Sequence, residues 1–305
     1  MTYLTRRRFI ITAAATALPL KAGAAPLRTE WRGRALGAEA RVVLLGMPEA
    51  KARRLFARIT GEVERIERAL SLYDAGSELS RLNRDGVLAR PGRDMTAIMG
   101  LSDQVHDATD GMFDPTIQPL FSLYAASAGS PDPARLAAAL DATGWHGMDR
   151  RDGGIRLQKG MALSFNGIAQ GYAADRVAAL LRAAGADSVL IDMGEIAAIG
   201  PNPGQPPFSA GIAGPGGEIV AEVPLRNTCL ATSAPRGTVF DAAGRVGHIL
   251  DPKRGASVDS WSIVSVSAPI AAIADGLSTA FCGMSRPTID AALARFPGAK
   301  LEAIA

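Results

Sequence analysis

A glycine-containing turn leads into a helix in the middle of this sequence and limits how the chain can fold around it. Residues 163–194 read LSFNGIAQGYAADRVAALLRAAGADSVLIDMG, an uncharged turn with Gly167 and Gly171, a helix, and a short apolar strand that ends at Gly194. Glycine has no Cβ, so another backbone or a ligand can approach it closely. Free N–H groups at a helix start also attract anions. Simple turn geometry explains the glycines equally well, and both interpretations remain open.

The first 25 residues have the composition of an export signal. Three arginines at 6–8 precede an uncharged run of twelve residues, 9–20, and residues 21–25 read KAGAA. A basic segment, a short apolar segment and a small-residue cleavage site are typical of a signal peptide, and the paired arginines fit the twin-arginine type. Twelve residues are too few for a membrane-spanning helix, which needs about 20. We expect a periplasmic domain at 26–305 without stable membrane insertion; the alternative is a basic tail on a cytosolic protein.

Without this signal the chain loses its basic character. The 33 basic and 30 acidic residues of the whole chain give a net charge of +3. Residues 1–24 hold four of the basic residues and no acidic one, which leaves 29 basic and 30 acidic residues and a net charge of −1. The charge therefore gives no indication of nucleic-acid binding.

The cysteines and histidines do not predict a soft-metal site. Cys229 and Cys282 are the only cysteines; they could pair in an oxidising compartment, but we expect both as buried small apolar side chains. Cys229, the first cysteine in the chain, lies far from the signal, so no lipid anchor is expected. The sequence has no CxxC, HExxH or Cys/His cluster, which argues against zinc. His106 and His146 have no acid–base partner in their sequence settings.

Apolar spacing and turn residues predict the other elements. Strands and helices interleave irregularly, and several strands read as neighbours in a meander, which indicates an α+β fold: a single domain of mixed or antiparallel sheets flanked by helices. We expect helices at 48–73, 95–109, 133–143 and 269–282, strands at 41–46, 155–164, 188–192 and 261–267, loops at 74–83 and 200–217, and a final helix–strand pair.

Three further segments contain side chains suited to chemistry. Residues 110–116 (DGMFDPT) combine two acids and a hydroxyl, a pattern that an N-cap alone also explains. His248 has an acid, Asp251, three residues later. Asp275 and Thr279 are four residues apart, hence on one face of the predicted helix. Their hard oxygen atoms suit Mg²⁺, and a lone acid in an apolar helix needs a partner.

Together these segments resemble one family, the FAD:protein FMN transferases of the thiamine-biosynthesis lipoprotein type. The resemblance extends in order over nearly all of residues 26–305, and the ordered set rather than any single motif carries it. The matching stretches are 36–38 (LGA), 71–73 (SLY), 77–83 (SELSRLN), 113–116 (FDPT), 167–175 (GIAQGYAAD), 231–233 (ATS), 248–252 (HILDP) and 274–280 (ADGLSTA).

The resemblance implies a Mg²⁺-dependent enzyme, with Ca²⁺ as an alternative ion, that binds FAD as its substrate. It implies transfer of FMN to a Ser or Thr hydroxyl of a client electron-transfer flavoprotein, with release of AMP. Asp275, Thr279 and the Gly167 carbonyl would hold the metal, and His248 would act with Asp275 in catalysis, as a base or a stabiliser of charge. The flavin and adenine sites would be lined by Leu36, Tyr73, Asp114, Pro115, Thr116, Ser164, Gln170 and Ile249.

Two positions in the glycine turn depart from the family pattern. The family commonly has an acid where Ser164 stands and a lysine where Gln170 stands, so one anion and one cation are absent together. Ala-Pro-Arg also follows Ser233 where a glycine and an aromatic residue are usual. Two alternatives stay open, a Mg²⁺-dependent FAD pyrophosphatase and a FAD-binding carrier or assembly factor without turnover. Asp275, Thr279 and His248 favour an enzyme.

Overall fold

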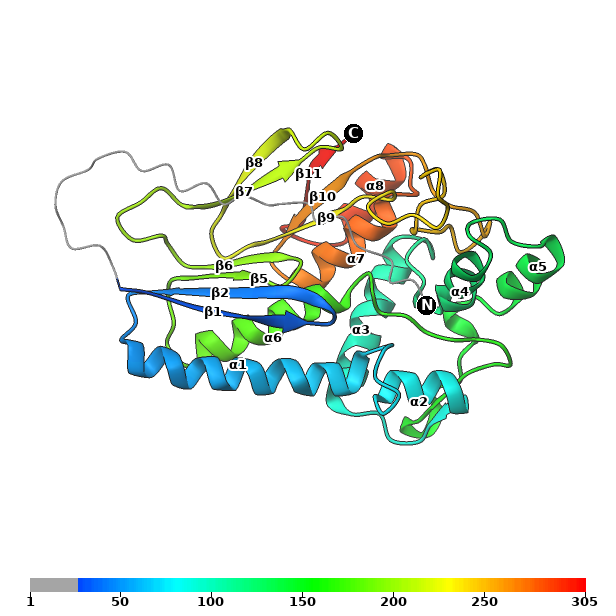
Figure 1. Cartoon of the computed structure of the whole chain (residues 1–305), viewed down its shortest axis with the longest axis horizontal. Coiled ribbons are helices and arrows are strands. Elements are labelled where there is room, and N and C mark those ends of the chain that lie inside the picture. The colour runs from blue at the N-terminus through cyan, green and yellow to red at the C-terminus, as the bar shows by residue number, and fades with distance from the viewer. Residues whose placement is uncertain (1–26) are drawn as a thin grey trace.

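An antiparallel seven-stranded sheet organises the chain, as the computed structural model shows for residues 27–305 (Figure 1). The predicted signal at 1–25 lies outside the described residues. The α+β fold is confirmed. In spatial order the strands are β1 (Arg28–Ala35), β2 (Ala38–Leu45), β5 (Val189–Asp192), β6 (Ile196–Ile199), β9 (Cys229–Ser233), β10 (Val264–Ala268) and β11 (Lys300–Ile304).

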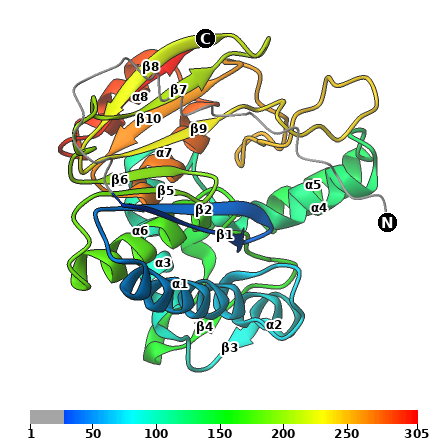
Figure 2. The same ribbon diagram turned by 60° about the vertical axis from the view of Figure 1, so that its left-hand side comes forward.

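Helices cover one face of this sheet, and the long ones coincide with the apolar periodicity. The α-helices are α1 (Glu49–Leu70), α2 (Glu78–Asp85), α3 (Arg93–Ala108), α4 (Gln118–Ala126), α5 (Pro133–Asp141), α6 (Ala169–Ala183), α7 (Ala271–Phe281) and α8 (Arg286–Leu293). Figure 2 shows α1 and α6 beneath the sheet. On α1, the buried positions Leu55, Ile59, Val63 and Ile66 form the stripe that packs there. Within residues 27–305, every helix is too short or too polar to cross a bilayer.

A hairpin of β7 (Phe208–Ala213) and β8 (Ile219–Leu225) covers the opposite face of the sheet. Its inward side chains form a second core with β6, β9 and the segment before β10. All four residues of β6 are therefore buried. The loop predicted at 200–217 is wrong over β7, because glycines and prolines on both sides mask the alternation of Phe208, Ala210 and Ile212, which are all buried.

Two other expected elements also differ. The predicted loop at 74–83 is wrong from Glu78 onward, where α2 begins. The hydroxyl of Ser77 accepts a hydrogen bond from the amide of Ser80 (3.0 Å), an N-cap, and Leu79 and Leu82 are buried. The strand predicted at 155–164 is wrong beyond its first two residues. Only β4 (Ile155–Arg156) pairs, with β3 (Val87–Leu88).

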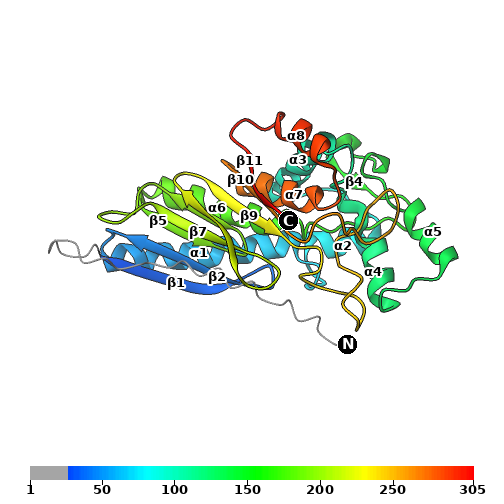
Figure 3. The same ribbon diagram turned by 90° about the horizontal axis from the view of Figure 1, so that it is seen from above.

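At one end of the molecule α4 and α5 project beyond the sheet (Figure 3). A third, smaller core lies there, with buried Leu120, Tyr124, Phe240 and Leu250. The phenol of Tyr124 donates a hydrogen bond to the carbonyl of Gly255 (2.8 Å). This contact ties the loop that contains His248 to α4. Both cysteines are buried and unpaired, as expected.

Helices α6 and α7 cap each other's first turns with carboxylates. Neither helix has a side-chain hydrogen bond from its own N-cap residue. Asp175 of α6 instead accepts from the amides of Ala271 and Ala272 (2.8 and 2.9 Å), and Asp275 of α7 accepts from the amide of Gly171 (3.0 Å). An anion at a helix N-terminus satisfies orphan N–H groups and the helix dipole. The two helices therefore fix each other's start.

Gly171 of the glycine-containing turn lies where the backbones of two helices approach closely. A Cβ at this position would lie 2.6 Å from the carbonyl carbon of Ala271 and 2.7 Å from the Cα of Ala272. Only glycine lets α6 approach the backbone of α7 this closely. The glycine is required by helix packing, and the reciprocal capping depends on it.

We expect Asp175 to make stability depend on pH. Burial raises the pKa of Asp175 to about 6, although the two amides that it accepts act to lower it. A carboxyl whose pKa is higher when folded stabilises the fold while protonated, so this contribution is complete below about pH 4 and is lost as the pH rises through 6. The free energy of unfolding of the wild type, minus that of Asp175→Asn, should fall by about 3 kcal/mol between about pH 4 and pH 7.

Urea unfolding of both proteins across this range measures the difference. The subtraction cancels the titrations that the two proteins share. A difference that stays flat with pH would mean that the helix N–H groups balance burial, and one that rises would mean that they outweigh it; either result would contradict the prediction.

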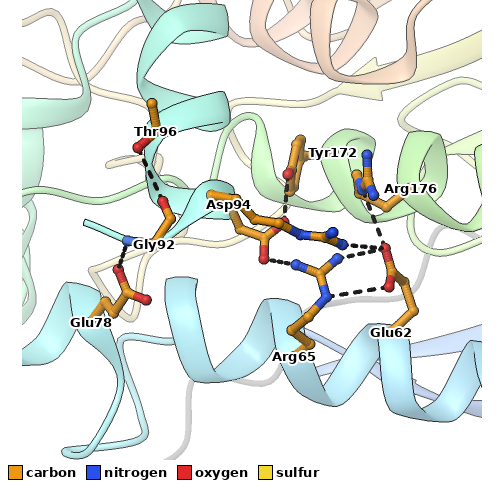
Figure 4. Close-up of polar contacts among 9 residues, drawn as sticks. Glu62, Arg65, Glu78, Gly92, Asp94, Thr96, Tyr172 and Arg176 are labelled. Atoms are coloured by element: carbon orange, nitrogen blue, oxygen red, sulfur yellow. Dashed lines mark hydrogen bonds and ion pairs between the residues drawn. The ribbon is translucent and has the colours of Figure 1, made fainter. Parts of the chain in front are cut away.

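An ion-pair network joins α1, α3 and α6 (Figure 4). Arg65 contacts Glu62 within α1 (2.5 Å) and Asp94 of α3, and Arg176 of α6 reaches Glu62 (3.2 Å). The phenol of Tyr172 donates to Asp94 (2.7 Å). Burial acts to raise the pKa of Glu62, but the hydrogen bonds and charges of Arg65 and Arg176 outweigh it and hold that pKa below its usual range. The network fixes the start of α6 relative to α1.

Candidate active site

The turn before α6, residues 163–171, is held by segments far from it in the sequence. Each tether is a hydrogen bond to a backbone group of the turn. Leu163 makes two of them with the side-chain amide of Asn83, through its carbonyl (2.8 Å) and its amide (2.7 Å). The Ser164 amide donates to the Pro115 carbonyl (2.7 Å). The Gly167 carbonyl accepts from the Thr279 hydroxyl (3.4 Å), and the Gly171 amide donates to the Asp275 carboxylate (3.0 Å). The turn is the meeting point of α2, the loop before α4, and α7.

The three predicted metal ligands lie at this meeting point. Thr279 approaches the Gly167 carbonyl, and a Cβ at position 167 would lie 3.0 Å from the Thr279 hydroxyl oxygen. Asp275, one turn earlier on α7, is only 4 % exposed. Ser233 at the end of β9 adds a further hydroxyl, 3.4 Å from that of Thr279. Oxygen is the only donor element in this set, which is the preference of Mg²⁺ and Ca²⁺.

A shallow groove between α1 and α6 contains three of the predicted flavin-site residues, Leu36, Tyr73 and Gln170. Tyr73 is 85 % exposed, so most of its side chain is accessible to solvent. Leu36 has φ 50° in the tight turn between β1 and β2, and its amide donates to the Glu67 carboxylate (2.9 Å). The lining of the groove is Leu36, Leu70, Ser71, Leu72, Tyr73, Asn166, Ala169 and Gln170.

The two unusual residues of the turn contact different neighbours. Gln170 packs against Gly194, where a Cβ would lie within 2.8 Å of the side-chain amide atoms. Its Nε2 is buried and makes no hydrogen bond within the described part of the chain. Ser164 is buried, and its hydroxyl accepts from the amide of Asn166 (3.3 Å). A buried amide donor without an acceptor is rare in folded proteins, and Gln170 also lines the groove.

Residues 114–116 form a capped turn, the alternative that the sequence left open. One oxygen of Asp114 accepts from the amide and hydroxyl of Thr116 (2.8 and 2.5 Å), and the other accepts from the amide of Trp145 (3.1 Å). Pro115 begins the short helix η1 (Pro115–Ile117), a favoured position for proline. These two polar side chains shape the loop, and the Pro115 carbonyl holds Ser164.

His248 is oriented by backbone carbonyls. Its Nδ1 lies 3.0 Å from the carbonyl oxygen of Pro235 and 3.2 Å from that of Thr238. Carbonyls only accept, so Nδ1 carries the proton and Nε2 the lone pair. Asp251 accepts from two amides of its own turn (2.8 and 3.0 Å). Ile249 packs, partly buried, against the main core and is not part of the groove lining.

Three residues of the stretches that resemble the family make structural contacts that the sequence did not predict. Asn83 anchors Leu163 at the start of the glycine turn, Asp175 caps α7, and Ser233 joins the hydroxyl cluster. Each of the three lies in a stretch that resembles the family, and that resemblance is the sequence signal that could have identified them. We expected no acid–base partner for His146; this is wrong, since its Nε2 lies 3.3 Å from the carboxylate of Asp107.

Comparison with known proteins identifies the family of this chain. The model of the ApbE family matches residues 36–304, and the chain belongs to that family of transferases. A protein named FAD:protein FMN transferase from Klebsiella pneumoniae (strain 342) is 29 % identical over 266 residues, 81 % of this chain and 76 % of that protein.

Solved structures share the fold. An ApbE protein from Thermotoga maritima superposes with a TM-score of 0.81 at 24 % identity, covering 92 % of this chain and 96 % of that one. A flavinyl transferase ApbE from Pseudomonas stutzeri superposes with a TM-score of 0.78 at 25 % identity, covering 89 % of each chain.

Proposed function

We propose that this protein is an FAD:protein FMN transferase that moves FMN from FAD to a Ser or Thr hydroxyl of a client flavoprotein and releases AMP. Family membership and the name of the relative from Klebsiella pneumoniae support this. Among the chain's own residues, the convergence of Asp275, Thr279 and the Gly167 carbonyl on one turn carries the proposal. That turn also supplies Gln170 to the groove.

The oxygen donors at the turn fit Mg²⁺. Asp275, Thr279 and the Gly167 carbonyl would hold the ion, and Ca²⁺ could take the same oxygen atoms. A bound Mg²⁺ would neutralise charge on the pyrophosphate and leave coordination positions for water and phosphate. Because Asp275 also accepts from the Gly171 amide, the rest of the fold holds its carboxylate in one orientation.

The transfer exchanges a phosphoanhydride bond of FAD for a phosphoester bond to the client. The acceptor hydroxyl oxygen bonds to the phosphorus on the flavin side, the pyrophosphate P–O bond breaks, and AMP leaves with the electron pair. The hydroxyl proton needs a base, and His248 is suited to this because its Nδ1 is fixed on carbonyls and Nε2 has the lone pair. Tyr73 and Gln170, which line the groove, would contact FAD there.

We further propose that the protein acts in the periplasm on a periplasmic or membrane client. The supporting observations are the three arginines at 6–8, the apolar run at 9–20 and the small residues that follow. Mass spectrometry of the N-terminus of protein recovered from a periplasmic fraction should find the chain cleaved near residue 24 or 25. An uncleaved chain found only in the cytosol would contradict the proposal.

The first test mixes residues 26–305 with FAD, Mg²⁺ and a client domain that carries an acceptor Thr. We expect the client's mass to increase by that of FMN less one water, with an equal amount of AMP released. AMP and free FMN beside an unlabelled client would indicate a pyrophosphatase. Tight FAD binding without AMP would indicate a carrier and would contradict the transferase.

A further inference from the structure

The end of α3 and the short helix η2 (Trp145–Gly147) bring together two histidines and a carboxylate. Ligand atoms of His106, Asp107 and His146 all lie within 4.8 Å of one another. We propose that these residues bind a divalent transition-metal ion of the Zn²⁺ type, separate from the oxygen ligands on α7. Two imidazoles and a carboxylate are donors that Zn²⁺ accepts, with a position left for water.

His106 already has the orientation of a metal ligand. Its Nδ1 donates to the carbonyl of Phe113 (2.8 Å), which leaves the lone pair on Nε2. Metal-bound histidines characteristically donate their second N–H to such a carbonyl, which fixes the tautomer and the ring. The residue is also 9 % exposed, so packing restricts the ring further.

The other two ligands are exposed and close to one another. The side chain of His146 is 69 % exposed and that of Asp107 is 49 % exposed, with 3.3 Å between Nε2 and the carboxylate oxygen. Tetrahedral ligands at about 2.0–2.1 Å from Zn²⁺ lie roughly 3.3 Å apart. The distance between His146 and Asp107 already matches that spacing, and the ligand atom of His106 lies within 4.8 Å of both.

The short helix that carries His146 is anchored independently of any ion. The indole of Trp145 donates to Asp103 of α3 (2.7 Å), and its backbone amide donates to Asp114 (3.1 Å). Arg150 pairs with Asp103 (2.8 Å), so its charge is compensated. Arg295 donates to the backbone carbonyl of Asp107 (2.5 Å) and places one positive charge beside the site, which reduces the affinity.

The proposed zinc site is connected to the loop at residues 113–116, where the Pro115 carbonyl accepts from the Ser164 amide. A metal on Nε2 of His106 would strengthen the bond from Nδ1 to Phe113, the residue before Asp114. Because the three ligands come from two separate segments, they form a site only in the folded chain. Zn²⁺ should therefore raise the unfolding temperature.

Calorimetric titration of untagged protein with ZnCl₂, with Mg²⁺ present in excess, tests the proposal. We expect one Zn²⁺ per chain, and a loss of affinity of about 100-fold in His146→Ala and at least about 10-fold in Asp107→Asn. In the variants that lose affinity, Zn²⁺ should no longer raise the unfolding temperature. Co²⁺ should give visible absorption in the wild type that His146→Ala lacks.

The matched control is Asp290→Asn, which removes an exposed carboxylate from α8. It should bind Zn²⁺ like the wild type. A wild type that binds no Zn²⁺ in stoichiometric amount would overturn the proposal and leave a surface ion pair between His146 and Asp107. Unchanged affinity in His146→Ala, or equal losses in Asp107→Asn and Asp290→Asn, would overturn it as well.

Discussion

Replacing Asp275 by asparagine should reduce FMN transfer by roughly 10²–10³-fold while the protein remains folded. Asparagine keeps an oxygen that can accept from the amide of Gly171, so the cap of α6 is retained in a neutral form. The substitution removes the negative charge that would hold Mg²⁺ beside Thr279. The rate of client labelling at saturating FAD, with and without added Mg²⁺, measures the effect.

A second variant separates capping from chemistry. Asp275→Ala should lose transfer to the same extent and also unfold at lower denaturant concentration, because the Gly171 amide then has no carboxylate acceptor. Asp290→Asn, on the surface of α8, serves as the control for loss of a carboxylate and should leave both quantities unchanged. Full transfer activity in folded Asp275→Asn would exclude a metal-binding role for this residue.

Replacing Gly171 by alanine should destabilise the protein by about 3 kcal/mol or more. The added Cβ would lie 2.6 Å from the carbonyl carbon of Ala271, and backbone atoms cannot move aside as a flexible side chain can. Helices α6 and α7 would have to separate, which would weaken both reciprocal caps, those of Asp175 and Asp275. Urea unfolding measures the loss, and transfer activity should fall with it.

The chain offers a matched control for this substitution on α1. A Cβ at Gly61 would meet no atom within 4 Å, and the residue is exposed in the middle of the helix. Gly61→Ala should therefore stabilise the protein by about 0.5–1 kcal/mol, the ordinary preference of a helix for alanine. Equal effects at the two positions would show that the close approach of α6 and α7 does not limit stability.

Local patterns predicted the long helices because each buries a continuous stripe along its own length. The spacing of apolar residues on α1 already contains this information. Local patterns failed where packing or capping decided the structure. Ser77 starts α2 inside a polar segment, and β7 lies among glycines and prolines yet is buried against β6. Extended residues around Leu163 pair with a side chain, Asn83, and not with a strand.

The family and the residues proposed for the chemistry could both be predicted from the order of motifs along the chain. These motifs point to Asp275, Thr279, Gly167 and His248, because chain order is enough to recognise a family and residue type is enough to suggest oxygen ligands for Mg²⁺. For Asp114 and Thr116 the sequence left an N-cap open as an alternative, and the structure shows that their side chains do form the cap of a turn.

Contacts between residues far apart in the chain became visible only when the helices and strands were packed together. The exchange of caps between Asp175 and Asp275, the need for glycine at 171, and the meeting of His106 with His146 all join segments far apart in the chain. Distances across space depend on how α6 packs on α7 and on where Trp145 anchors its short helix. No local pattern contains those distances, because they are set when the helices pack against each other.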